Sequence, residues 1–454
     1  MITNGYDIYY QKRKWSEIKG EEEYKKKKKK LTRDVGCFEI FVTPTGDYNI
    51  IISDDDLVYS WGSNSYGELG VDSIEPSLHS PEIVPWFRGV KINDISLGSN
   101  HVLAIIDNRT AVICWGKNTY GELGLGDREI RSTPTLIPYF KDNLVLSVFA
   151  GCDNSMVLLR NGSIFGFGYN RMGELGVEEN RSVYYIIPQK VDFGCNRVKV
   201  KKVVLCNLFT LFILRNDRVL ACGYNEFGQL GIGTISFSTR FPTNVPFFEH
   251  HKIDYITHGA RHCLAMLKDG QMAAWGYNKH GELGFNQGEE VESSPRIVDL
   301  FPGRKIKKLI ARGNDSMALL EDGNVYTWGE TEPYSVYVSF HPDKYKEVEE
   351  HEILEVIPKH ILSYSTPIQQ IFLGRQYVFF IEKDESFMGY GDNYFGQLTF
   401  KHGTSYISPS RISFLQQRNY FDYFKSKRSI SFAILFTRNP QTSPELIEYI
   451  FHLL

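Results

Sequence analysis

A ten-residue segment recurs along this chain at nearly constant spacing, and this repetition restricts the possible folds more than any other feature of the sequence. The first copy reads WGSNSYGELG over residues 61–70, and further copies or variants begin at residues 115, 167, 222, 275, 328 and 390. Each copy has glycine at its second position, at Gly62, Gly116, Gly168, Gly223, Gly276, Gly329 and Gly391. Subtracting neighbouring numbers gives intervals of 54, 52, 55, 53, 53 and 62 residues. A period above about 40 residues with strand-like content is typical of a β-propeller rather than a helical solenoid.

Each repeat contains four short runs with the composition of β-strands. Two apolar runs, such as residues 101–106 and 112–115, flank a turn, which in three copies is Asn161-Gly162, Asp269-Gly270 or Asp322-Gly323. These dipeptides favour a hairpin because both central positions accept a positive φ. A proline, which suits a sheet edge because it cannot donate to the ladder, then opens a third strand at Pro81, Pro134, Pro242, Pro295 and Pro409. A fourth run, such as residues 92–97, leads into the next repeat. We therefore predict an all-β fold, a seven-bladed β-propeller of four-stranded blades.

The composition of the repeated segment has a structural explanation. Its glycines permit turns and close backbone approach, Asn64 can bond to the backbone of its own loop, and Leu69 anchors that loop to the core. The residue before the leucine is acidic in four copies, Glu68, Glu122, Glu174 and Glu282. Because Gln229 and Gln397 replace it in two others, we interpret its role as hydrogen bonding rather than charge.

Length and composition fit one large domain with a segment at either end. The chain has 454 residues, of which 42% are apolar and 14% aromatic, enough for a sizeable core. We predict a basic, disordered tail over residues 1–35, the propeller over 36–415, and a closing strand with a short C-terminal amphipathic helix over 416–454. The strand is expected at residues 431–436. The helix follows Ser443-Pro444-Glu445, and its apolar face comprises Leu446, Ile447, Ile450, Phe451 and Leu454.

The cysteines and the apolar stretches indicate where the protein resides. Seven cysteines without a Cys-x-x-Cys pair favour a reduced intracellular protein over a disulfide framework or a metal site. The N-terminus lacks an apolar signal region, and no apolar stretch reaches the roughly 20 residues of a membrane span. We expect a soluble monomer of the cytoplasm, the nucleus or both, with no membrane contact.

Basic residues gather in the N-terminal tail. Residues 1–36 hold 11 Lys or Arg against 6 Asp or Glu, a balance of +5, whereas the whole chain has a net charge of −3. Two clusters ten residues apart have the arrangement of a bipartite nuclear import signal: Lys12, Arg13 and Lys14, then Lys25, Lys26, Lys27, Lys28, Lys29 and Lys30. Base composition alone could also produce such a lysine run. Direct DNA binding is less favoured because the tail lacks interleaved arginines and aromatics.

The repeats resemble those of the regulator of chromosome condensation family. The shared features are the period of about 53 residues, the Gly-x-x-His-x-Leu-Ala starts at Gly98 and Gly259, the Asp-Gly hairpin and the recurring WGxNxxGELG segment, over roughly residues 36–415. The resemblance implies a propeller fold. The founding member of the family exchanges nucleotide on the small GTPase Ran and binds the nucleosome. Other members belong to ubiquitin ligases, cilium-associated GTPase regulators or an ultraviolet-B photoreceptor.

The resemblance also implies a partner-binding face, formed by the loops after each strand-leading glycine. Its candidate residues here are Asn100, His101, Asp153, Arg261, His262, Asp315 and Arg375. Only Asp153 and Asp315 match the acidic position at which the exchange factor contacts its GTPase. The intervals between Gly62 and Gly276 leave no length for the inserted hairpin wedge of that factor, and the one long interval holds an insertion over residues 330–366. The photoreceptor needs a tryptophan where this chain has Ala260.

No metabolic active site is visible in the repeats. Neither His101 nor His262 has a paired nucleophile or carboxylate, which favours structural roles over general-base catalysis. We expect no cofactor and no metal. Two functions remain open: a regulator of a small GTPase resembling a nucleotide exchange factor, and a non-catalytic scaffold for ubiquitin-ligase substrates or for chromatin, with a nucleosome or DNA contact as a weaker possibility. Both require a protein partner.

Overall fold

The computed structural model describes residues 38–42, 46–53, 56–73, 75–141, 143–177, 182–194, 198–285, 290–329, 359–360, 367–374, 377–383, 387–398 and 407–411. The chain divides into two compact units, Met1–Ser410 and Arg411–Leu454. All the architecture below belongs to the first unit, except the last residue of β28. The predicted tail, the 330–366 insertion apart from residues 359–360, the closing strand and the C-terminal helix lie outside the described residues.

The described residues form seven four-stranded antiparallel sheets, the blades of a β-propeller. Blade 1 comprises β1 to β4 (Phe38–Val42, Tyr48–Ser53, Val58–Ser63, Ser77–Ile83), blade 2 β5 to β8 (Asp94–Leu97, His101–Ile106, Ala111–Gly116, Arg131–Leu136) and blade 3 β9 to β12 (Val145–Ala150, Asn154–Leu159, Ile164–Tyr169, Tyr184–Lys190). Blade 4 comprises β13 to β16 (Val200–Leu205, Phe209–Leu214, Val219–Tyr224, Ser238–Asn244) and blade 5 β17 to β20 (Ile253–His258, His262–Leu267, Met272–Tyr277, Val291–Val298). Blade 6 comprises β21 to β24 (Ile306–Arg312, Asp315–Leu320, Val325–Gly329, Lys359–His360) and blade 7 β25 to β28 (Ile368–Leu373, Tyr377–Glu382, Phe387–Gly391, Ile407–Arg411). The predicted all-β, seven-bladed fold is confirmed.

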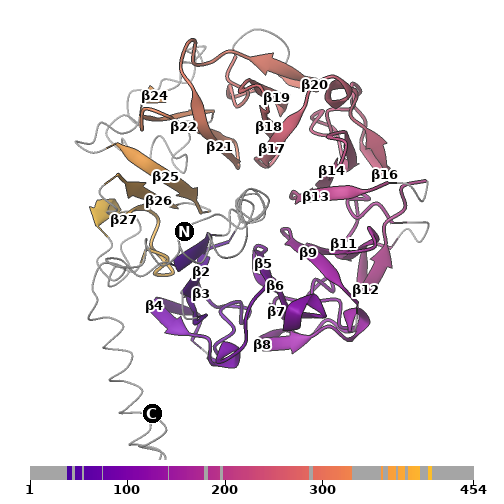
Figure 1. Cartoon of the computed structure of the whole chain (residues 1–454), viewed down its shortest axis with the longest axis vertical. Coiled ribbons are helices and arrows are strands. Elements are labelled where there is room, and N and C mark those ends of the chain that lie inside the picture. Colours follow the sequence, from indigo (N-terminus) through magenta and orange to yellow (C-terminus); the bar gives the residue numbers. More distant parts are fainter. Residues whose placement is uncertain are drawn as a thin grey trace, which may run out of the picture. The chain divides into compact units, whose positions relative to one another are not determined.

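Helical structure in the described part of the chain is limited to four short 3-10 turns. These are η1 (Pro85–Phe87), η2 (Asp107–Arg109), η3 (Pro138–Phe140) and η4 (Pro246–Glu249). Within the first unit, Figure 1 shows the blades in chain order around a common centre, with the first strand of blades 2 to 6 innermost. The fourth strand therefore forms the outer edge.

Two details of the predicted repeat are wrong. The fourth predicted run, residues 92–97, contains β5 and so belongs to the next blade, because a blade begins one strand before the leading glycine. The prolines do not open the outer strands but lie inside them. Pro81 lies in β4, where the register with β3 shifts between Ser60 and Gly62. A bulged edge strand tolerates proline because no ladder bond is needed there.

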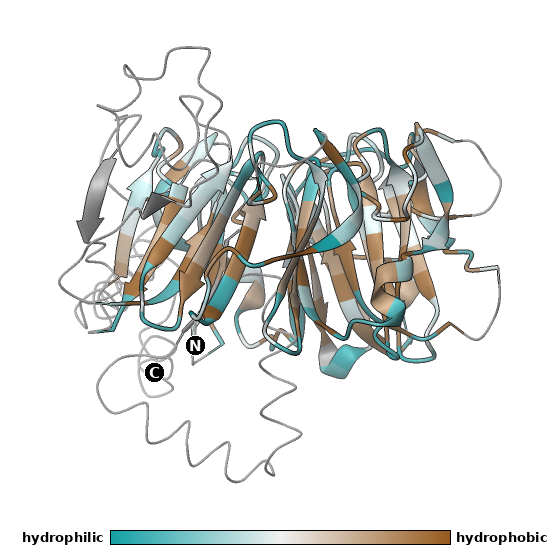
Figure 2. Cartoon of the chain, turned by 90° about the horizontal axis from the view of Figure 1, so that it is seen from above, coloured by the Kyte–Doolittle hydropathy of each residue, from teal (hydrophilic) through white to brown (hydrophobic). Residues whose placement is uncertain are grey.

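The core lies between neighbouring blades. The second strand of blades 2 to 7 is buried along all six residues, for example His101–Ile106 and His262–Leu267. Figure 2 shows apolar strands in the interior and hydrophilic loops at both ends of the strands. The predicted core tryptophans are buried, with Trp61, Trp115 and Trp275 at 0% exposure and Trp328 at 5%.

The repeated segment forms the loop between the third and fourth strands, and its predicted bonding is confirmed. Asn64 Oδ1 accepts the backbone N–H of Leu69 at 3.2 Å, and the same bond recurs in every described copy with Asn at this position. Glu68 accepts the N–H of Tyr66 at 2.7 Å, and Gln229 and Gln397 accept the equivalent N–H at 3.0 and 2.9 Å. Either side chain performs this task, which explains why glutamate and glutamine alternate.

The same loop ties each blade to the next. Trp115 Nε1 donates to the backbone carbonyl of Glu68 in blade 1 at 2.9 Å, and Trp275 Nε1 makes the equivalent bond to Gln229. Trp61 Nε1 donates to the carbonyl of Gln397 at 2.9 Å, so blade 7 closes onto blade 1 by this device. Among the described residues, every blade is built from consecutive strands, and no strand is exchanged to close the ring.

Candidate functional site

The predicted loops and the repeated segments lie at the same end of the blades. In an antiparallel blade, the link from first to second strand and the link from third to fourth strand emerge at one end. We call this end the motif face; in blade 2 it comprises residues 98–100 and 117–130. The opposite end, formed by the turns between second and third strands and the links between blades, is called the turn face.

The seven candidate residues differ in their exposure. Arg261 is exposed, and Asn100 and Asp153 are half-buried. His101, His262 and Asp315 are buried, at 0%, 1% and 6% exposure. Arg375 lies outside the described residues. The candidates that can touch a partner directly are therefore Arg261, Asn100 and Asp153, while the buried ones can act only by supporting their loops.

The two histidines connect neighbouring blades. His101 Nε2 lies 2.9 Å from Ser155 Oγ, and that hydroxyl donates to the carbonyl of Glu122 at 2.7 Å. Since the hydroxyl proton is used in this way, Nε2 must be the donor to the hydroxyl oxygen. His262 repeats the geometry with Ser316 at 2.9 Å. Burial lowers the pKa of His101 to about 4 and that of His262 to about 3, so both rings stay uncharged at neutral pH.

The glycine before each of these histidines is required by close approach. A Cβ on Gly98 would lie 2.4 Å from the carbonyl oxygen of Gly151 and 2.5 Å from the ring of His101. The histidine ring thus covers its own leading glycine while reaching the next blade. This explains the recurring Gly-x-x-His pattern without any chemistry at the ring.

Asp153 is held by a cation on the neighbouring loop. Lys117 Nζ lies 2.6 Å from Asp153 Oδ1 and 3.7 Å from Glu122 Oε1. Burial favours a lower pKa for Lys117, but the hydrogen bond and charge of Asp153 outweigh it and raise the pKa. The ammonium also lies 5.2 Å from the ring centre of Tyr120. Asp153 is therefore half of an ion pair, not an isolated acid.

Arg261 is stacked on aromatic rings, a feature that the sequence reasoning missed. Its guanidinium lies 4.6 Å from the ring centre of Phe227 and 5.8 Å from that of Tyr277. The two rings pack edge to face at 4.9 Å, and Tyr120 and Tyr169 repeat the contact in blades 2 and 3. The available signal was the aromatic residue that often follows the first motif glycine or precedes the second. Such stacking holds a cation in place for a partner.

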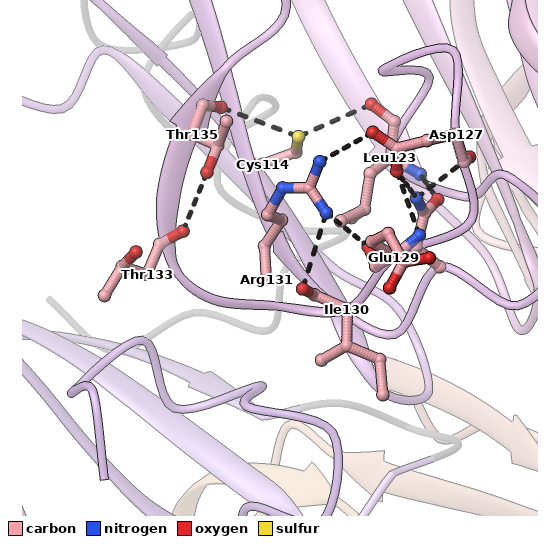
Figure 3. Close-up of polar contacts among 9 residues, drawn as sticks. Cys114, Leu123, Asp127, Glu129, Ile130, Arg131, Thr133 and Thr135 are labelled. Carbon is pink, nitrogen blue, oxygen red and sulfur yellow. Dashed lines mark hydrogen bonds and ion pairs between the residues drawn. The ribbon is translucent and has the colours of Figure 1, made fainter.

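The outer part of the blade 2 loop is bonded internally. Arg131 Nη2 lies 2.6 Å from Asp127 Oδ2, and Arg131 Nη1 donates to the carbonyl of Glu129 at 2.8 Å (Figure 3). Cys114 points under the same loop toward the carbonyls of Leu123 and Thr135, at 3.4 and 3.6 Å. Asp127 and Arg131 therefore stabilise the loop by pairing with each other, which leaves them less available to a partner.

The described part of the chain carries neither a metal-ligand cluster nor a membrane-spanning helix. There, no group of three or more His, Cys, Asp or Glu side chains is placed to hold a metal ion. None of its helices is long and apolar enough to cross a membrane. The described cysteines are free thiols, with Cys114, Cys206, Cys222 and Cys263 buried and Cys152 half-buried.

Comparisons with known proteins identify the repeat. The regulator of chromosome condensation (RCC1) repeat matches residues 55–105, 111–158 and 216–266. The structure of yeast RCC1 (Prp20) bound to Kap60 superposes with a TM-score of 0.64 at 22% identity, covering 84% of each chain. The chain therefore carries RCC1-type repeats, which form blades of its β-propeller. One relative with such repeats is named as a GTPase regulator, the X-linked retinitis pigmentosa GTPase regulator.

Three curated relatives match part of this chain and part of their own length. The ultraviolet-B receptor UVR8 of Arabidopsis thaliana is 28% identical over 64% of this chain and 64% of its own length. The human E3 ubiquitin-protein ligase HERC2 is 26% identical over 62% of this chain and 6% of its length. The canine X-linked retinitis pigmentosa GTPase regulator is 28% identical over 54% and 29%. The chain thus spans less than two thirds of each of these relatives.

Proposed function

We propose that this propeller binds a small GTPase through its motif face and regulates it, in the manner of a nucleotide exchange factor. One relative is named as a GTPase regulator, and a structural study of yeast Prp20p concerns its binding to Gsp1p and histones. The observation that carries the proposal is the exposed Arg261, held on Phe227 and Tyr277 by stacking at 4.6 and 5.8 Å. An arginine ordered in advance on an aromatic support is typical of an interface hot spot.

Nucleotide release from a panel of purified small GTPases tests this function. We expect faster release from at least one member, and at least tenfold weaker binding for Arg261→Ala because its guanidinium would contact the partner. Lys252→Ala, an exposed cation on the turn face, is the matched control and should leave binding unchanged. Faster release with no member of the panel would reject exchange activity. Unchanged binding by Arg261→Ala would place the partner elsewhere.

A scaffold without exchange activity is the second candidate, and the two acids favour it. Asp153 is paired with Lys117 at 2.6 Å, and Asp315 is 6% exposed with Arg312 at 3.9 Å. Neither matches the exposed acid that the exchange factor presents. The HERC2 relative and the histone binding of Prp20p supply the classes of partner. If a GTPase binds without faster release, or if only another protein is captured, the scaffold is supported.

We further propose that the protein acts as a monomer in the nucleus, the cytoplasm or both, and that its lysine-rich tail directs nuclear import. The tail residues, Lys12 to Lys14 and Lys25 to Lys30, lie outside the described part of the chain. Residues 1–35 fused to a fluorescent reporter would then accumulate in the nucleus. Replacement of the six consecutive lysines by alanine should abolish that accumulation; an unchanged distribution would refute the signal.

A further inference from the structure

A small pocket on the turn face lies between blades 3 and 4. Its volume is about 170 Å³. Leu158, Leu159 and Val200 supply apolar walls and are buried, at 0%, 6% and 1% exposure. The rest of the lining includes Gly162 and Asn161 in the hairpin turn of blade 3. The pocket is on the opposite end of the blades from the proposed GTPase face.

Three cations from separate chain segments converge on this pocket. Arg160 follows β10, Lys199 precedes β13 and Arg215 follows β14, and all three side chains line the pocket and are exposed. The backbone N–H of Arg215 donates to the carbonyl of Lys199 at 2.9 Å, which places the backbones of these two residues side by side. None of the described lining residues is acidic, and no ion pair involves these three cations within the described residues. Like charges that line one pocket repel one another, so a bound anion would stabilise the group.

The equivalent position between blades 4 and 5 contains a carboxylate that the pocket between blades 3 and 4 lacks. Lys268 and Lys252 occupy the same register there, because the N–H of Lys268 donates to the carbonyl of Lys252 at 2.9 Å. At this junction a carboxylate pairs with Lys268 and with Lys201 of β13, since Asp217 lies 2.5 Å from Lys268 Nζ and 3.7 Å from Lys201 Nζ.

The acid has a direct counterpart in the turn of blade 3. The sequence Arg215-Asn216-Asp217 aligns with Arg160-Asn161-Gly162, so Gly162 stands where the other turn has Asp217. Both residues adopt a positive φ, +93° and +66°. A Cβ on Gly162 would meet nothing within 4 Å. The exchange of aspartate for glycine leaves the cations of this pocket without the carboxylate that the next junction supplies.

We propose that this pocket binds a phosphomonoester, presented as phosphoserine or phosphothreonine on a partner protein. Guanidinium groups match phosphate oxygens in bidentate geometry. A phosphorylated side chain carries a charge of about −1.5 to −2 at pH 7, which suits three cations better than the single charge of a phosphodiester. The apolar walls can accommodate the carbon atoms next to the ester oxygen. The site provides a second point of partner contact that is independent of the motif face.

Fluorescence anisotropy with a short labelled peptide carrying one phosphoserine tests the site in the full chain. We expect saturable binding at least tenfold tighter than that of the unphosphorylated twin, weakened by salt and competed by inorganic phosphate. Gly162→Asp should weaken binding at least tenfold without lowering the Tm, because Asp217 shows that the turn accepts aspartate. Arg215→Gln should act likewise. Arg171→Gln, an exposed cation on the motif face, is the control and should bind normally.

Several results would overturn the proposal. Equal binding of the two peptides, or full binding by Gly162→Asp, would exclude a phosphate site at this turn. Tighter binding of a single-stranded oligonucleotide would indicate a phosphodiester ligand. Binding of inorganic phosphate without binding of the phosphopeptide would restrict the site to the free ion. None of these results bears on GTPase binding, so the two proposals can fail separately.

Discussion

The junction between blades 3 and 4 and the junction between blades 4 and 5 are built on one plan with different residues. At the 4/5 junction, Trp275 is fully buried and donates to the carbonyl of Gln229 at 2.9 Å. At the 3/4 junction, Cys222 takes the place of the tryptophan, and its thiol lies 3.5 Å from the carbonyl of Glu174. The scaffold therefore tolerates large changes at a junction as long as the motif loop keeps its backbone bonds.

The 3/4 junction differs from the 4/5 junction at three positions, although its Glu174 and Gly162 follow the commoner pattern of the repeat. It has a cysteine for the tryptophan, a buried carboxyl where the 4/5 junction has an amide, and Gly162 where the 4/5 junction has Asp217. Thr210 partly compensates by donating its hydroxyl to the carbonyl of Glu174 at 2.6 Å. We infer that the 3/4 junction is the weaker of the two and has more freedom to carry a function.

The largest expected effect comes from truncating the tryptophan. Trp275→Ala should lower the free energy of unfolding by about 3–5 kcal/mol, since it leaves a cavity in the core and removes the donor to Gln229. Cys222→Ala should cost only ~1 kcal/mol, because the side chain is small. Urea titration followed by circular dichroism and by tryptophan fluorescence would measure both. Trp86→Ala, at 38% exposure, is the control for a surface tryptophan. Equal losses at Trp275 and Cys222 would mean that the junctions are equivalent.

The sequence predicts the architecture because the same strand and turn pattern recurs seven times at a nearly constant period. The bonds of Asn64 and of the alternating Glu and Gln were predictable for the same reason, since each uses backbone groups within five residues. The strand at which each blade begins was not predictable, because a continuous repeat does not show where one sheet ends and the next begins. The strand order had to come from the hydrogen bonds of β5 with β6.

The candidate site was less predictable than the fold. The bond from His101 to Ser155 spans 54 residues, and nothing local distinguishes a buried histidine from one on a binding face. Arg261 was predicted as a loop residue, but its stacking on Phe227 depends on a neighbouring blade. The phosphate pocket was missed because three separate segments form it, and its decisive feature is the absence of one carboxylate in one turn. The role of Asp153 in partner binding stays a prediction.

The second comparison concerns the buried carboxyl at the 3/4 junction. Burial raises the pKa of Glu174 to about 7 from its ordinary 4.5. Below pH 4.5 the carboxyl is protonated in both folded and unfolded chains, so its burial does not lower the free energy of unfolding. Between pH 4.5 and about 7 the folded chain alone keeps the proton, so stability falls as pH rises. Above that range a penalty of about 3 kcal/mol at most is constant.

Glu174→Gln should remove this penalty. We expect a gain of roughly 1–3 kcal/mol at pH 8 and almost no change near pH 4.5, because Gln229 shows that the loop accepts an amide at this position. Urea midpoints across this pH range would measure the difference. Glu122→Gln is the matched comparison: burial raises the pKa of Glu122 as well, but Lys117 at 3.7 Å partly offsets this, so its gain at pH 8 should be smaller than that of Glu174→Gln. A pH-independent effect of Glu174→Gln would show that Glu174 is ionised without cost.

The smallest expected effect separates the two turns themselves. Asp217→Asn should cost less than about 1 kcal/mol, because Lys268 is 41% exposed and exposed ion pairs contribute little. The loss should shrink in 1 M salt, where the Debye length is about 3 Å.

Gly162→Asp makes the reciprocal change, so its folded state should gain a similar stabilisation from Arg215, offset in part by the positive φ that glycine adopts more easily. Urea midpoints for both variants and for the double variant would measure these increments, with Asp269→Asn as a control in the turn of blade 5. The contradicting result is that Gly162→Asp leaves the free energy of unfolding unchanged at low salt while Asp217→Asn lowers it. That result would mean that the cations of the 3/4 pocket are too far apart to share one anion. The charge argument for the proposed phosphate site would then fail.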